Sequence, residues 1–145
     1  MIIGPAVADD LESIESLLLA CGLPLDGVRG HFENFLVARA SSTDPSIIGC
    51  AAIERYGVSC VFRSLAVSPA HRGRGLGRAL METALDRAAA HGSSEVFLLT
   101  RTIERMASRQ GFERIERDQV TAAARASLEF SINACSTAIV MRRML

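Results

Sequence analysis

The sequence contains no lysine and no tryptophan, and its cysteines and histidines are few and scattered. All sixteen of its cationic residues are arginine. A P-loop and a Schiff-base enzyme both need a lysine, so these two chemistries are excluded. The four cysteines (Cys21, Cys50, Cys60 and Cys135) have no metal-type spacing, so we expect no metal site. We interpret them as reduced and mostly buried.

The chain also lacks an excess of charge and a long apolar run. Its 16 basic and 16 acidic residues give a formal net charge of zero, which disfavours nucleic acid and anionic membranes as partners. No apolar run approaches the roughly 18 residues that span a bilayer, and the N-terminal segment lacks a signal-peptide pattern. With 145 residues, 49% of them hydrophobic, we expect one domain over residues 1–145 and a cytoplasmic location.

Hydrophobic periodicity predicts a mixed α+β fold. Alternating and β-branched runs predict strands at residues 2–7, 34–40, 46–57, 59–67, 95–100, 112–117 and 137–144. Helical spacing predicts helices at 9–22, 25–31, 74–90, 102–110 and 119–130. A strand, a crossover helix and a second strand predict one parallel pair, and hairpins predict antiparallel pairing elsewhere. We expect a mostly antiparallel sheet with helices on both faces.

Three glycines, Gly73, Gly75 and Gly77, lie between a predicted strand and a predicted helix. Free amides and the helix dipole make such a turn suitable for an anion, and Arg72, Arg74 and Arg78 flank it. The pattern is neither a Rossmann fingerprint nor a Walker loop. Spacing alone leaves two interpretations open: a phosphate-binding turn, or a glycine-rich loop with solvated arginines.

The motif "RGRGLG" at residues 72–77 resembles the acetyl-CoA signature of the GNAT acetyltransferase superfamily, (Q/R)-x-x-G-x-(G/A). The preceding "LAVSPAHR" and the later "RQGFERI" are also typical of that superfamily. Within it, "FLVA", "GCA", "RSLAV", "LLT" and the C-terminal "RASLEF" and "MRRML" are similar to the small acetyltransferases of arsenic-resistance operons. Those in turn resemble the acetyltransferase domain of N-acetylglutamate synthase. The resemblance implies a GNAT fold with a splayed parallel strand pair.

The resemblance also implies where acetyl-CoA, the expected co-substrate, would bind. Its pyrophosphate would lie on the turn made by Arg72, Gly73, Arg74, Gly75, Leu76 and Gly77, next to Arg78. Its pantetheine arm would run between the strands at 59–67 and 95–100, pairing with the backbone of Leu65 and Val67. A backbone N–H of Leu65 or Ala66 would face the thioester oxygen and stabilise the oxyanion.

An acetyltransferase of this kind needs a base for the amine but no enzyme nucleophile, so Cys50 and Cys60 are interpreted as structural. Some relatives place a carboxylate where this chain has Val61. Glu54 on the neighbouring strand is therefore the first candidate base, and Tyr56 on the same face would orient the substrate. The alternative for Glu54 is an ordinary solvent-facing carboxylate. Many relatives carry a tyrosine acid where this chain has Ala107.

Two arginines are candidates for binding a carboxylate on the acceptor. Arg63 lies on the strand before the signature, and Arg101 follows the strand at 95–100. The alternative is that each pairs with a structural carboxylate, such as Glu54 or Glu129. The tail with Glu129 and Cys135 would cover the acceptor site, and the strand at 137–144 would join a partner's sheet in a homodimer.

The sequence thus predicts an N-acetyltransferase that acetylates a small-molecule amine, an amino acid or an analogue of one. A GNAT-fold module that binds acyl-CoA or an amino acid without turnover remains the alternative. A protein acetyltransferase is disfavoured, because the neutral chain offers no strongly charged patch. The identity of the acceptor and the oligomeric state are left open.

Overall fold

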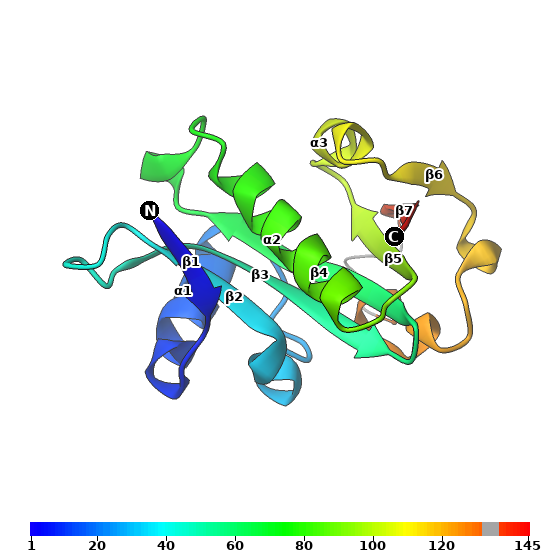
Figure 1. Cartoon of the computed structure of the whole chain (residues 1–145), viewed down its shortest axis with the longest axis horizontal. Helices are drawn as coiled ribbons and strands as arrows, with labels where there is room; N and C mark the ends of the chain where they lie inside the picture. Colours follow the sequence, from blue (N-terminus) through cyan, green and yellow to red (C-terminus); the bar gives the residue numbers. More distant parts are fainter. Residues whose placement is uncertain (132–136) are drawn as a thin grey trace. The chain divides into compact units, whose positions relative to one another are not determined.

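The computed structural model describes residues 1–131 and 137–145, in which seven strands form one sheet of order β1-β2-β3-β4-β5-β7-β6 (Figure 1). The predicted role of Cys135 lies outside the described residues. The strands are β1 (Ile2–Pro5), β2 (Phe35–Arg39), β3 (Ile47–Tyr56), β4 (Ser59–Val67), β5 (Glu95–Thr100), β6 (Glu113–Ile115) and β7 (Ile139–Met144). The helices are α1 (Leu11–Ala20), α2 (Leu76–Ala90) and α3 (Glu104–Arg109).

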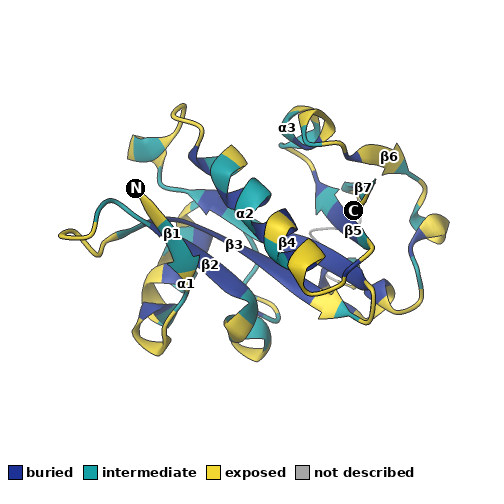
Figure 2. Ribbon diagram, viewed as in Figure 1, coloured by how far each residue is buried: buried dark blue, intermediate teal, exposed yellow. Residues whose placement is uncertain are grey.

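The chain divides into two compact units. The first contains Met1–Ala52 and Ser64–Ala84, and the second contains Ile53–Arg63 and Leu85–Leu145. The two strands of the central hairpin, β3 and β4, and the helix α2 each contribute residues to both units. Figure 2 shows that the central strands are largely buried, as a sheet with two covered faces requires. None of the helices formed by the described residues is long and apolar enough to cross a membrane.

In the first unit, successive strand residues point to opposite faces of the sheet, and a different helix covers each face. One core cluster joins the α1 face to one side of the sheet: Ile14, Leu18, Phe35, Val37, Cys50 and Ala52. On the other side, a side chain at Gly49 would meet Leu76 and Leu80 of α2. Helices therefore cover both faces of this part of the sheet, which confirms the prediction.

Gly49 is a point where α2 packs tightly against the sheet. A Cβ atom built there would lie 3.0 Å from the Cδ1 atom of Leu80 and 3.2 Å from the Ala66 carbonyl oxygen. We expect Gly49→Val to lower the free energy of unfolding by about 1–3 kcal/mol through overpacking. Urea denaturation measures this. Gly4→Val is the control, because a Cβ at Gly4 meets nothing within 4 Å; equal losses in both variants contradict the close approach.

In the second unit, β4 and β5 form the parallel pair through Ser59–Val61 and Glu95–Phe97. The two strands run on beyond this three-residue ladder, to Val67 and Thr100. The strand β7 pairs antiparallel with β5 along its whole length and with β6 on its other edge. The strand β7 therefore has a partner strand on each side within this chain, and the homodimer that was expected through it stays a prediction.

The predicted helix at 119–130 is wrong. This segment contains short 3₁₀ turns: η4 (Arg117–Gln119), η5 (Ala124–Ala126) and η6 (Leu128–Phe130). Ser127 has extended dihedral angles (φ −62°, ψ 135°), and its hydroxyl accepts a hydrogen bond from the backbone N–H of Glu129. A serine bonded in this way favours a turn over a helix, whatever the alanine content around it. The helix expected at 25–31 is likewise replaced by the 3₁₀ segment η2 (Arg29–Asn34).

Candidate active site

The glycine turn of the first unit has the left-handed backbone that its sequence suggests. After the 3₁₀ turn η3 (Pro69–His71), Gly73 has φ 76° and Gly75 has φ 77°. Residues other than glycine rarely adopt this backbone conformation. A Cβ at either position would meet nothing within 4 Å, so backbone conformation rather than crowding requires glycine here.

The turn leads directly into the first turn of α2. The first hydrogen bond of the helix α2 runs from the Ala79 N–H to the Gly75 carbonyl, at 3.0 Å. The amides of Leu76, Gly77 and Arg78 precede that bond, and such amides have no acceptor within their own helix. Gly77 lies inside α2 and not in the turn. Amides of this kind, together with the helix dipole, favour a phosphate group.

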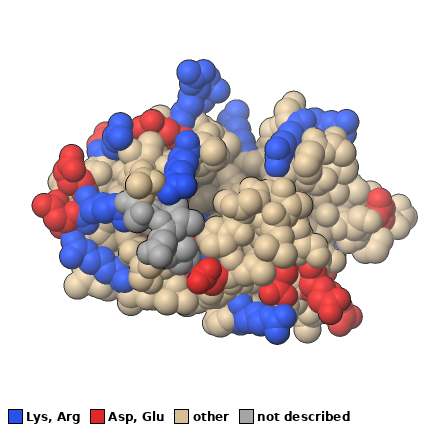
Figure 3. All heavy atoms as spheres, turned by 180° about the vertical axis from the view of Figure 1, so that it is seen from behind, with Lys and Arg blue, Asp and Glu red and all other residues tan. Residues whose placement is uncertain are grey.

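The flanking arginines are not equivalent. The Arg72 Nε donates to the Val67 carbonyl at 3.0 Å, and its Nη2 lies 3.3 Å from the Cys21 Sγ. Arg78 pairs with Glu82 one turn along α2 at 2.8 Å. Arg74 is exposed. Figure 3 shows arginine and acidic side chains both present on the face drawn, which agrees with the neutral composition.

The extended backbone of β4 is interrupted at Ser64. Ser64 has φ 59°, an uncommon value for a residue with a side chain, and its carbonyl accepts a hydrogen bond from the Cys50 thiol at 3.4 Å. Such a residue interrupts the alternation of a strand. Beyond it, Leu65 and Val67 are half-buried and Ala66 is buried. The resemblance predicts that the backbone of Leu65 and Val67 pairs with the pantetheine arm and that an N–H of Leu65 or Ala66 faces the thioester oxygen.

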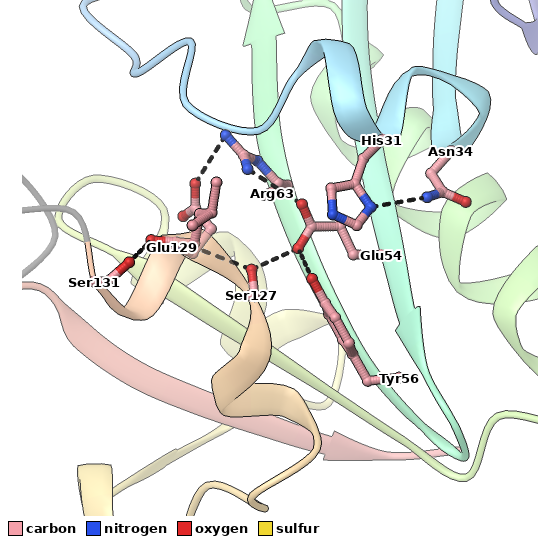
Figure 4. A network of polar contacts seen from close by, with 9 residues as sticks. His31, Asn34, Glu54, Tyr56, Arg63, Ser127, Glu129 and Ser131 are labelled. Carbon is pink, nitrogen blue, oxygen red and sulfur yellow. Dashed lines mark hydrogen bonds and ion pairs between the residues drawn. The ribbon is translucent and has the colours of Figure 1, made fainter.

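The second unit contains a network of polar side chains centred on Glu54 (Figure 4). Glu54 is fully buried, not solvent-facing as its alternative interpretation held. Its Oε1 atom accepts hydrogen bonds from the Tyr56 hydroxyl at 2.8 Å and from the Ser127 hydroxyl at 2.5 Å. Its Oε2 atom accepts from the Arg63 Nη1 at 3.2 Å. Glu54 and Tyr56 share one face of β3, as the strand period predicts.

Arg63 connects this carboxylate to a second one. Its side chain is fully buried, and its Nη2 lies 3.3 Å from the Oε1 atom of Glu129. The formal charges of Glu54, Arg63 and Glu129 sum to minus one. The structural pairing considered as the alternative for Arg63 is therefore present, with both carboxylates that the sequence suggested.

The network includes one residue that the sequence analysis missed and excludes one that it proposed. The sequence analysis missed Ser127 because the composition of its segment is typical of a helix. The signal that indicates a turn is this serine itself, placed two residues before Glu129. Arg101 does not join Arg63: it is exposed, and its Nη2 donates to the Thr137 hydroxyl at 2.6 Å.

Burial raises the pKa of two cysteine thiols. It raises the pKa of the Cys50 thiol to about 12, and it also raises the pKa of Cys60, whose thiol donates to the Ser93 hydroxyl at 2.9 Å. Nucleophilic cysteines need the thiolate, so both behave as packing residues. Ala107 is fully buried, and no group of three or more potential metal ligands occurs among the described residues.

Tyr56 offers a direct test of the network. Burial and the hydrogen bond to Glu54 raise its pKa to about 12, from about 10 for a free tyrosine. The stability that this shift contributes is complete below pH about 10 and is lost as the pH rises through about 12. Tyr56 is the single tyrosine and the chain has no tryptophan, so ultraviolet absorbance follows this phenol alone. We expect Glu54→Gln to lower the titration midpoint; an unshifted midpoint in the unaltered protein contradicts the network.

Three comparisons with known proteins find similarity to acetyltransferases: a family model, a curated relative and solved structures. The model of a family described as "Acetyltransferase (GNAT) family" matches residues 22–115. A curated relative, an uncharacterized N-acetyltransferase (CT2212) of Chlorobaculum tepidum, is 35% identical over 95 residues. The match covers 65% of this chain and 59% of the relative, so the chain spans less than two thirds of that protein.

Two solved structures share the fold. Rv2747 of Mycobacterium tuberculosis, in complex with CoA and NLQ, superposes with a TM-score of 0.84 at 24% identity, covering 100% of this chain and 99% of that one. N-acetylglutamate synthase of Neisseria gonorrhoeae, in complex with CoA and N-acetyl-glutamate, superposes with a TM-score of 0.83 at 23% identity. The match covers 99% of this chain and 35% of the synthase chain.

Proposed function

Because this chain belongs to the GNAT acetyltransferase family, we propose that it transfers an acetyl group from acetyl-CoA to the amine of a small molecule. The observation that carries the proposal is the turn at Gly73 and Gly75, whose left-handed glycines precede the free amides of α2. The family relationship supports acetyl-CoA as the ligand, since the matched residues 22–115 include the whole turn.

In this proposal the first unit binds the co-substrate. The diphosphate accepts hydrogen bonds from the amides between Gly73 and Arg78, with Arg72 and Arg74 adding positive charge. The pantetheine arm follows the backbone of Leu65 and Val67 on β4. A backbone N–H of Leu65 or Ala66 then donates to the thioester oxygen as negative charge develops on it.

The chemistry is a direct transfer. The neutral amine attacks the thioester carbonyl, the C–N bond forms, the C–S bond breaks, and CoA leaves as the thiolate. The amine must first lose a proton, and we propose that Glu54 accepts it through a water molecule while Tyr56 orients the acceptor. Since Ala107 replaces the tyrosine acid of many relatives, the thiolate leaves without a protonated side chain at that position.

We propose an amino acid or an amino-acid analogue as the acceptor. Arg63 is the favoured partner for its carboxylate, because guanidinium groups bind carboxylates with high geometric specificity. Arg101 is the second candidate. The N-acetyl-glutamate in the gonococcal synthase, a protein of the same fold, supports this substrate class. The likeness to arsenic-operon enzymes makes a toxic amino-acid analogue a further candidate, which the neighbouring genes would test.

The test is an assay of CoA release with acetyl-CoA, the twenty amino acids and a set of simple amines. We expect at least one amino acid to raise CoA release well above the rate of hydrolysis. The alternative is a binding module, which the alanine at position 107 keeps open. If acetyl-CoA binds in calorimetry but no amine raises CoA release, the module replaces the enzyme.

A further inference from the structure

The two carboxylates that hold Arg63 differ in the elements that carry them and in their exposure. Glu54 lies within the strand β3, is 0% exposed, and accepts hydrogen bonds from Tyr56, Ser127 and Arg63. Glu129 lies in the three-residue 3₁₀ turn η6, and its side chain is 9% exposed. Its Oε1 atom lies 3.3 Å from the Arg63 Nη2. Glu129 is therefore the carboxylate that solvent reaches.

The charge of this cluster limits how an acceptor carboxylate can reach Arg63. With both glutamates in place, the formal charges already sum to minus one. A third carboxylate added to the same buried guanidinium would bring the sum to minus two, and uncompensated buried charge is costly. If the incoming carboxylate replaces one glutamate, the sum stays at minus one and Arg63 stays paired. Exchange is therefore favoured over addition.

We infer that Glu129 occupies the place on the Arg63 Nη2 that the carboxylate of the acceptor takes, so that the acceptor binds by exchange. This inference rests on the proposed function, and it adds a specificity-determining residue to it. Glu54 stays in place throughout, because Tyr56 and Ser127 hold it independently of Arg63. An acceptor without a carboxylate has nothing to exchange, so Glu129 does not affect its binding.

The variant Glu129→Gln removes the competing charge and keeps the size of the side chain. We expect it to lower the KM of the amino acid that releases most CoA by about tenfold, the order expected of a charge-assisted hydrogen bond. The KM of the carboxamide analogue of the same amino acid stays within about twofold, because that analogue makes no exchange. Glu113→Gln, an exposed glutamate of β6, is the control for the change in net charge.

Hydrogen exchange on the unaltered protein provides a second readout that needs no variant. The Glu129 N–H donates to the Ser127 hydroxyl at 3.3 Å in the unliganded protein. If Glu129 leaves Arg63 when the amino acid binds, peptides containing residues 124–131 should exchange faster with the amino acid than with its carboxamide. Equal or slower exchange with the amino acid contradicts the inference.

The outcomes separate this inference from the proposed function. If no amine raises CoA release, the proposed function fails and the exchange fails with it. If an amino acid is acetylated but Glu129→Gln leaves its KM unchanged or raises it, the exchange alone is overturned. A lower KM for the amino acid and an unchanged KM for the carboxamide support both.

Discussion

Replacing Gly75 by valine is expected to raise the KM for acetyl-CoA at least tenfold while the KM of the acceptor stays within about twofold. Gly75 has φ 77°, and a β-branched side chain in this region costs about 1–3 kcal/mol. The turn must relax away from its left-handed conformation, which moves the amides that precede the first helical bond of α2. A loss of about 1.4 kcal/mol of binding free energy corresponds to the tenfold change. Initial rates at varied concentrations of each substrate measure it.

A matched variant separates backbone strain from loss of the phosphate site. Gly57, in the turn after β3, has φ 65°, and a Cβ there would also meet nothing within 4 Å. Gly57→Val should therefore suffer similar strain and a similar fall in the free energy of unfolding. We expect it to leave the KM for acetyl-CoA unchanged. Parallel increases in the KM for both substrates in the Gly75 variant would contradict the placement of the diphosphate.

Replacing Arg63 by methionine is expected to lower the free energy of unfolding by about 3–5 kcal/mol. The side chain is fully buried between Glu54 and Glu129, and removing one partner of a buried ion pair leaves uncompensated charge in the protein interior. Chemical denaturation at neutral pH measures the loss. The same variant should lose CoA release with an amino acid even under conditions where it remains folded, because the acceptor carboxylate has no guanidinium to bind.

Two further variants make the interpretation specific. Adding Glu54→Gln to Arg63→Met should recover part of the lost stability, since one of the unpaired charges is then gone. Arg29→Met breaks an exposed pair with Glu15 and should leave the denaturation midpoint almost unchanged. An Arg63 variant as stable as the Arg29 variant would show that the buried network does not hold the second unit together.

Most of the sheet could be predicted because its strands depend on local pattern. The apolar runs of β2 and β3 and the turn-rich "SSTDPS" between them are enough to predict a hairpin, and the two strands do pair antiparallel. The turn at Gly73 and Gly75 was predictable for the same reason, because left-handed glycines before a helix depend on neighbouring residues.

The errors lie where distant residues decide the structure. The segment around Ser127 has the composition of a helix, but its serine bonds to Glu54, which is 73 residues away in the chain. The neighbours of the C-terminal strand could not be predicted either, because β5 and β6, which pair with it, are separated from it in the chain. Whether Glu54 faces solvent was left open, because its burial depends on distant partners such as Ser127, which no local pattern connects to it.

The most direct test of the account is a crystal structure of the protein with acetyl-CoA bound. We predict that the diphosphate oxygens accept hydrogen bonds from backbone amides between Gly73 and Arg78, with the left-handed conformation of Gly73 and Gly75 retained. A coenzyme whose diphosphate contacts another part of the chain, and leaves these amides to solvent, would contradict the central claim.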